Sequence, residues 1–312
     1  MYWGCVKRKR LKQGTSHREN PERYQRRTSL SGLLAWLLGL ALAPAVQALE
    51  YCDQSPPAGL AAKTSRATLI LIIDDLGHRR RNGMAMVELN GKINLAVLPH
   101  TPHSTELAEA GFAAGKEIML HAPMSNARGT AVGKGGLTPQ LSREEFDRIL
   151  AENIDAIPHV RGINNHMGSE LTTLPLQMGW VMQTLLRRDL YFVDSRTNAA
   201  TVAAKTAADY SVPNLSRSVF LDNEIEMEAI REQFRRLVLQ AEKDGLAVGI
   251  GHPYRQTAEV LEAALPGLKC RGIELALVSE VLNASEPAPK PVRNRSPSGS
   301  EPDFDIPLGH IG

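Results

Sequence analysis

The chain has 312 residues, of which 43% are hydrophobic and 22% charged, so it is long enough to bury a substantial globular core. Its formal net charge of +2 conceals an uneven distribution. Residues 1–48 hold nine Lys or Arg and two Glu, which leaves 27 basic and 32 acidic residues in the remainder. That remainder offers no broad basic surface, so no nucleic-acid partner is expected.

The N-terminal segment has the pattern of a secretory signal. Basic residues precede an apolar run over residues 33–43, and Val46 and Ala48 place small residues at the two positions that define a cleavage site. The run is short for a membrane span. We therefore expect residues 1–48 to be a signal peptide and the rest of the chain to be exported. An uncleaved membrane anchor is the alternative.

Export would remove Cys5 and leave two cysteines, Cys52 and Cys270. In an oxidising compartment two remaining cysteines can form a disulfide. The alternative is that Cys270 is buried while Cys52 stays free on a loose segment.

Composition divides the part expected to be exported into three segments. Residues 49–66 are polar and are expected to form an arm, and residues 284–312 are rich in Pro and Ser, which predicts a disordered tail. Residues 67–283 remain as one domain. In this domain short apolar runs predict strands at 68–73, 94–98, 117–121, 162–164, 190–194, 246–251 and 274–278.

Helical patterns separate several of these strands. Ser142 and Glu145 form a capping box before a helix at 143–156, a second helix is expected at 175–188, and a third at 224–243 ends before Gly245. Alternating strands and helices predict an α/β fold with a parallel sheet, and about seven strands can close into an irregular (β/α) barrel. Functional residues of such folds lie at the carboxyl ends of the strands.

Acids or imidazoles stand at most of these strand ends. They are Asp74 and Asp75, His100, His121, His166, Asp194 and His252. Carboxylates and imidazoles around one point form a ligand set for a divalent metal, with zinc or another transition metal favoured over calcium. One acid of the adjacent Asp74–Asp75 pair can bind the metal while the other accepts a proton. The alternative for the pair is that both cap the following helix.

Five motifs, LIIDDLG, GKEIMLHAPMS, GINNHMGS, YFVDSRT and VGIGHPY, resemble those of the divergent polysaccharide deacetylases, which are distant relatives of the NodB-type carbohydrate esterases. The resemblance covers nearly all of residues 67–282 and implies a distorted (β/α) barrel and a metal-dependent deacetylase. It implies that Asp74 is the general base, Asp75 a metal ligand, His121 the first metal histidine and His252 the general acid.

The chain departs from this pattern at one ligand. The usual second histidine, four residues after the first, is replaced by Ser125. We expect His166, at the end of the neighbouring strand, to take its place, so the predicted ligands are Asp75, His121 and His166. The alternative for His166 is a hydrogen bond to the backbone. Asp194 is expected either to orient the catalytic His252 or to form an ion pair with Arg196.

These assignments predict a periplasmic enzyme that uses a divalent metal, zinc in the first instance, to remove acetyl groups from a cell-envelope polysaccharide. One alternative is a non-catalytic descendant of the fold that binds a glycan or an envelope protein. Another is a metal-dependent amidase that acts on peptide cross-links.

Overall fold

The computed structural model describes residues 67–285, so the expected signal peptide and arm, and the tail from residue 286, lie outside the described residues. The strands are β1 (Ala67–Leu76), β2 (Asn94–Val97), β3 (Glu117–Met124), β4 (Val160–Met167), β5 (Tyr191–Asp194), β6 (Asn214–Ser216), β7 (Val219–Phe220), β8 (Leu246–Gly251) and β9 (Ile273–Leu275).

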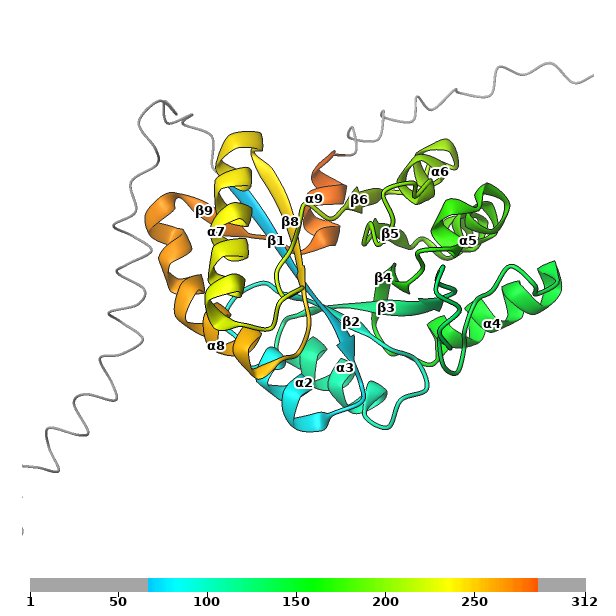
Figure 1. Cartoon of the computed structure of the whole chain (residues 1–312), viewed down its shortest axis with the longest axis horizontal. Coiled ribbons are helices and arrows are strands. Elements are labelled where there is room, and N and C mark those ends of the chain that lie inside the picture. The colour runs from blue at the N-terminus through cyan, green and yellow to red at the C-terminus, as the bar shows by residue number, and fades with distance from the viewer. Residues whose placement is uncertain (1–66, 286–312) are drawn as a thin grey trace, which may run out of the picture. The chain divides into compact units, whose positions relative to one another are not determined.

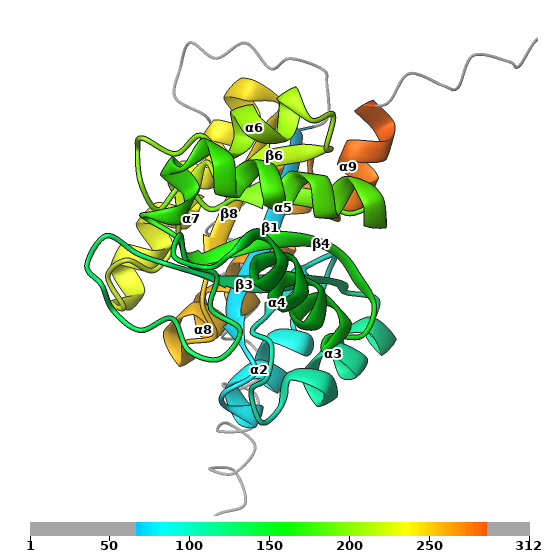
Figure 2. The same ribbon diagram turned by 90° about the vertical axis from the view of Figure 1, so that its right-hand side faces the viewer.

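The helices surround these strands, as Figures 1 and 2 show. They are α2 (Arg80–Val87), α3 (Ser104–Ala113), α4 (Arg143–Asp155), α5 (Pro175–Arg188), α6 (Ala203–Asp209), α7 (Met227–Asp244), α8 (Arg255–Ala264) and α9 (Val278–Ser285), with short 3-10 turns at Leu171–Thr173 and Leu265–Arg271. The predicted capping box is present, because the Ser142 side chain accepts from the backbone N–H of Glu145 and the Glu145 side chain accepts from that of Ser142. None of the described helices is both long enough and apolar enough to cross a membrane.

The described strands form one parallel sheet in the order β6-β5-β4-β3-β2-β1-β8-β7, with β9 paired to β1. The two edge strands, β6 and β7, are separated in sequence by only Arg217 and Ser218. The backbone N–H of Arg217 donates to Asp194 on β5 and that of Ser218 donates to Val248 on β8. The sheet therefore curves until its edges meet at this crossing, and the predicted α/β barrel class is confirmed.

Alternation along the strands divides the core into two layers. Leu69, Leu71 and Ile73 of β1 belong to the large cluster under the helices, whereas Ile70 and Ile72 belong to a smaller cluster inside the barrel. Because both faces of these strands are buried, they read in the sequence as continuous apolar runs.

The C-terminal segment corrects one strand prediction. β9 ends at Leu275, and Val278, expected in a strand, is instead the first residue of α9. Val278, Val281 and Leu282 have the i, i+3, i+4 spacing of a helix face, and they pack on the inner cluster at the amino-terminal end of the barrel. α9 also continues to Ser285, two residues into the predicted tail.

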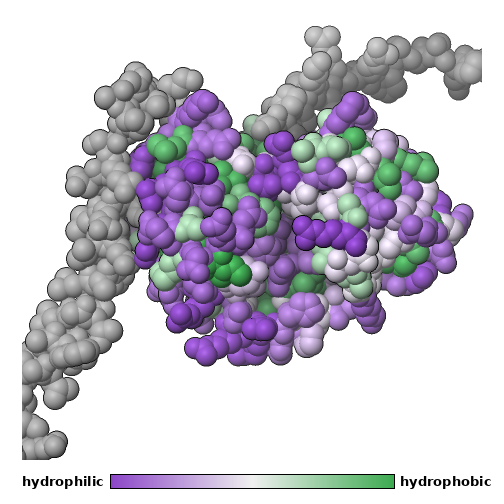
Figure 3. Space-filling view, in the orientation of Figure 1, coloured by the Kyte–Doolittle hydropathy of each residue, from purple (hydrophilic) through white to green (hydrophobic). Residues whose placement is uncertain are grey.

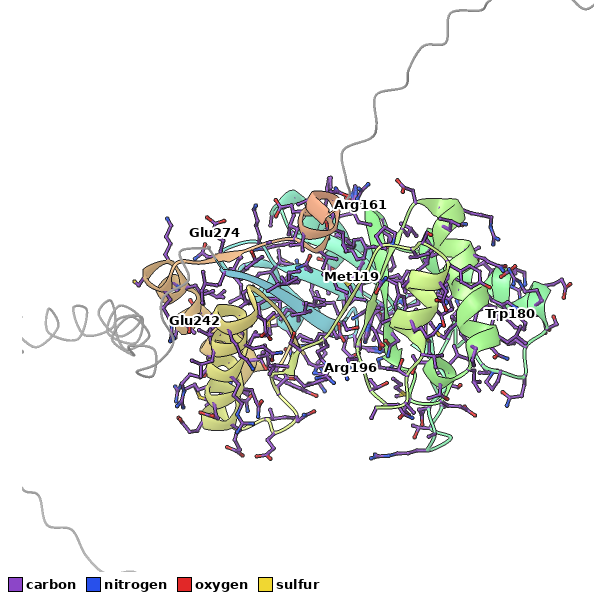
Figure 4. All side chains as sticks on the ribbon, turned by 90° about the horizontal axis from the view of Figure 1, so that it is seen from above. Met119, Arg161, Trp180, Arg196, Glu242 and Glu274 are labelled. Carbon is purple, nitrogen blue, oxygen red and sulfur yellow. The ribbon has the colours of Figure 1, made fainter. Side chains whose placement is uncertain are left out.

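Figure 4 shows the two ends of the barrel. Arg161 lies beside α9, Met119 lies in the interior, and Arg196 lies at the opposite end, where the carboxyl ends of the strands meet. On the face shown in Figure 3 the described residues are mainly hydrophilic, with hydrophobic residues in small separate groups.

Candidate functional site

The first strand ends in an irregularity that brings two adjacent acids to one site. Asp74 continues the inward alternation of Ile70 and Ile72, so in a regular strand Asp75 would face the helices. The pairing of β1 with β2 shifts between Ile73 and Leu76, and Asp75 has a left-handed backbone with φ of 59°. Such shifts near active sites redirect a side chain. The Asp75 carboxylate is thereby turned toward the histidines of β3 and β4.

Three side chains meet at this point. Oδ1 of Asp75 lies 2.8 Å from Nδ1 of His166 and 3.1 Å from Nε2 of His121, and the two nitrogens lie 3.1 Å apart. Tetrahedral bonds of about 2.0–2.1 Å would place ligand atoms roughly 3.3 Å apart, close to these separations. Asp75 Oδ1 is also buried and has no hydrogen bond of acceptable geometry. This unpartnered oxygen beside two imidazole nitrogens fits a divalent cation.

The charge of Asp75 agrees with such a site. Burial alone would raise the pKa of Asp75, but the imidazoles of His121 and His166, 3.1 and 2.8 Å from its Oδ1, hold it well below its usual range. Burial alone would lower the pKa of His121, but the neighbouring carboxylates raise it. Asp75 therefore stays ionised across the physiological range, as a metal ligand must.

Asn164 connects this group to Asp74. Its Oδ1 lies 2.7 Å from Nδ1 of His121, and its Nδ2 donates to Oδ1 of Asp74 at 2.6 Å. A proton on Nδ1 of His121 leaves the lone pair of Nε2 free for a cation. The fully buried Asn164 thus orients both a ligand and the neighbouring acid.

Asp74 is 3% exposed, and its Oδ2 lies 3.7 Å from Nε2 of His121. Burial raises its pKa above the usual value and outweighs the opposing effects of His121, His252 and Asn164. The helix-cap alternative for the two acids is wrong, because α2 begins at Arg80 and has no side-chain cap.

His252 lies on the other side of Asp75, directly after β8. Its Nε2 is 3.9 Å from Oδ2 of Asp75, and its Nδ1 is 2.8 Å from Oδ1 of Asp222. Asp222 Oδ2 accepts from the backbone N–H of His252 at 2.7 Å and from the hydroxyl of Thr257 at 2.7 Å. Burial alone would lower the pKa of His252, but Asp222, followed by Asp74 and Asp75, raises it to about 9.

Asp222 is the functional residue that the sequence reasoning missed, and it corrects the role given to Asp194. Asp194 does not contact His252. Its Oδ1 accepts from the backbone N–H of Arg196 at 2.8 Å, without a guanidinium ion pair, and its Oδ2 accepts from Thr201 at 3.0 Å. The signal for Asp222 was another acid after an apolar run, Val219 to Leu221, but β7 has only two residues.

Backbone strain marks the same end of the barrel. Asp75, His100, Met167 and Arg196, four of the seven described non-glycine residues with positive φ, lie at or just after the ends of β1, β2, β4 and β5. Such conformations cost free energy and gather at functional sites.

A cavity of about 280 Å³ opens on Asp75 and His252, with His78, Arg79, Asn82 and Tyr254 on its other walls. A larger one, of about 690 Å³, is lined by His100 and residues of α4 and lacks the clustered acids and histidines. His100 instead bonds Asn153 at 3.0 Å. The smaller cavity is therefore the candidate substrate pocket.

The model of the divergent polysaccharide deacetylase family matches residues 71–282. The chain belongs to this family. The family match spans every residue of the Asp/His cluster, from Asp74 to His252.

Two relatives and one solved structure resemble this family member. The uncharacterized protein YibQ of Escherichia coli (strain K12) is 37% identical over 69% of this chain and 67% of its own length. An uncharacterized protein of Haemophilus influenzae is 35% identical over 65% of this chain and 73% of its own length. The crystal structure of uncharacterized protein ATU2773 from Agrobacterium tumefaciens has a TM-score of 0.67 at 19% identity, covering 75% of this chain and 94% of that one, which shows a shared fold.

Proposed function

We propose that this deacetylase-family protein is a divalent-metal-dependent hydrolase that removes acetyl groups from an N-acetylated polysaccharide of the cell envelope. The observation that carries the proposal is the convergence of Asp75, His121 and His166, with Asp74 and His252 beside them. One carboxylate and two imidazoles favour zinc among the common divalent metals. The signal-like residues 1–48 support an exported, periplasmic enzyme.

The three ligands would hold the cation, which when bound lowers the pKa of water and polarises a carbonyl. Asp74 is placed to accept the proton of the attacking water, with Asn164 fixing its Oδ1. His252, held by Asp222, is placed to give a proton from Nε2 to the leaving nitrogen. Water adds to the acetyl carbon, the C–N bond breaks, and acetate and a free amine leave.

The test compares metal content and acetate release from N-acetylated oligosaccharides. Asp75→Ala should lose metal, because it removes one of three ligands and the only carboxylate among them. Asp74→Asn should keep metal but lose on the order of two to four decades of activity. Asp147→Asn, which changes an acid on α4 paired with Arg143, is the matched control and should change neither quantity.

One observation favours a non-catalytic glycan- or envelope-protein-binding function instead. Ser125 stands where the family pattern expects a second metal histidine, and its buried hydroxyl has no hydrogen-bond partner. If the wild type holds no metal and releases no acetate from any oligosaccharide offered, this second function replaces the first. Full metal content in Asp75→Ala would show that the ligand assignment is wrong.

A further inference from the structure

A second polar cluster lies beside the candidate metal site, at the end of β5. It consists of Ser195, Arg196 and Arg217. Ser195 is 1% exposed, and its hydroxyl oxygen is buried without a hydrogen-bond partner. Buried hydroxyls are almost always satisfied, so the Ser195 hydroxyl has a hydrogen bond to offer to a group from outside the chain.

The two arginines bring positive charge to this cluster, and the Arg217 guanidinium also lies 4.9 Å from the centre of the Phe220 ring. Arg217 donates from Nε to the Ser195 carbonyl at 2.7 Å and from Nη2 to the Arg196 carbonyl at 3.0 Å. Burial, together with the nearby charge of Arg196, lowers the pKa of Arg217, although Asp194 and Asp74 act in the opposite direction. Neither guanidinium forms an ion pair with a carboxylate in the described part of the chain. An anion would relieve this repulsion.

The topology places the cluster next to the catalytic residues. β5 pairs with β4, which carries His166, and neighbouring strands lie about 4.8 Å apart. Arg217 lies in the crossing that leads through β7 to Asp222. Arg196 has a left-handed backbone with φ of 49°, an exposed side chain, and a position at the open end of the barrel in Figure 4.

We propose that Ser195, Arg196 and Arg217 form a subsite for a carboxylate group carried by the polysaccharide, beside the acetyl group that is removed. This inference rests on the proposed function and adds that the substrate is an anionic glycan. Guanidinium groups form strong, charge-assisted hydrogen bonds to carboxylates, and a hydroxyl can donate one more. The acetyl group itself is neutral and would not use these charges.

The experiment measures binding by calorimetric titration of the metal-loaded full chain, in an Asp74→Asn background that prevents turnover. Two probes are compared, a tetrasaccharide of N-acetylglucosamine and one that alternates N-acetylglucosamine with N-acetylmuramic acid, whose carboxylates are the only charges. The carboxylated probe should bind at least about tenfold more tightly, as a charge-assisted contact predicts.

Three variants locate the effect. Arg196→Gln should remove most of the preference for the carboxylated probe and leave the neutral probe unchanged. Ser195→Ala should weaken binding of the carboxylated probe while keeping or raising the melting temperature, because it deletes a buried hydroxyl without a partner. Arg161→Gln, at the opposite end of the barrel in Figure 4, makes the same charge change and should have no effect.

Equal affinity for the two probes, or an equal loss in Arg161→Gln, would overturn the subsite. Inorganic phosphate that abolishes the preference at concentrations near the dissociation constant of the probe would also overturn it, because the cluster would then bind small anions rather than a sugar carboxylate. Acetate release is assayed separately. Release without a carboxylate preference refutes only the subsite, and a preference without release refutes only the deacetylase function.

Discussion

Asp222→Asn should change the acidity of His252 more than any other single substitution in the described residues. In the wild type Asp222 supplies the nearest negative charge, and its two oxygens accept from Nδ1 and the backbone N–H of His252 and from Thr257. The pKa of His252 is about 9 as a result, against a usual value of 6.5. Without the charge of Asp222 the pKa of His252 should fall, because burial lowers it and only Asp74 and Asp75 remain to raise it.

The magnitude follows from the two pKa values. At pH 7.5 His252 is about 97% protonated with a pKa near 9, and would be about 9% protonated if its pKa fell to the usual 6.5. As the general acid of the proposed function His252 must carry its proton, so acetate release at this pH should fall by up to about tenfold and should recover partly as the pH is lowered toward 6.

The raised pKa of His252 also makes the free energy of unfolding depend on pH. A histidine whose pKa is raised in the folded state stabilises the protein fully below the unfolded pKa of about 6.5, and this contribution disappears as the pH rises through about 9. Because the folded and unfolded pKa values of about 9 and 6.5 differ by about 2.5, this contribution to the free energy of unfolding is roughly 3 kcal/mol at most. The wild type should lose free energy of unfolding over this interval, and Asp222→Asn should lack that part of the loss.

The assay is an NMR titration of the His252 imidazole in the metal-free protein, with chemical denaturation across the same pH range. Thr257→Val is the matched control, because it removes one hydrogen bond to Asp222 and keeps its charge, so the pKa of His252 should stay high. If the pKa in Asp222→Asn stays within about half a unit of the wild type, the assignment of the shift to Asp222 is wrong.

Three further predictions concern separate parts of the molecule. Asn164→Leu should weaken metal binding by about 10- to 100-fold in a chelator competition, because His121 loses the partner that orients it. Gly162→Ala should lower the free energy of unfolding by roughly 1–3 kcal/mol in denaturant titrations, since the added Cβ would lie 2.1 Å from the buried tyrosine ring of β5. Cys52 lies outside the described residues, so the Cys52–Cys270 disulfide stays a prediction, and two free thiols in denatured, unreduced protein would reject it.

Much of the site was predictable because parallel strands end at one edge of a sheet. Once β1, β3, β4 and β8 are recognised as parallel strands, the acids and histidines at or near their carboxyl ends must lie near each other. The positions of these residues at the strand ends and the family motifs were enough to group Asp75, His121 and His166, and the structure places their ligand atoms within 4.8 Å of one another.

The partner of His252 was decided only by tertiary structure. Asp194 and Asp222 both follow short apolar runs, and the sequence provides no distance from either to β8. The order of the sheet separates them, because β7 pairs directly with β8, whereas β5 pairs with β4 and β6. Asp222 therefore contacts His252, and Asp194 organises its own loop.

The orientation of Asp75 was also beyond the sequence. Alternation along a regular strand points adjacent residues to opposite faces, so an Asp–Asp pair should have one acid inside the barrel and one outside. The register shift after Ile73 and the left-handed backbone at Asp75 arise from how β1 fits between β2 and its other neighbours. Local sequence determined which chemical groups stand at the strand ends, whereas packing between distant strands determined which of those groups face one another.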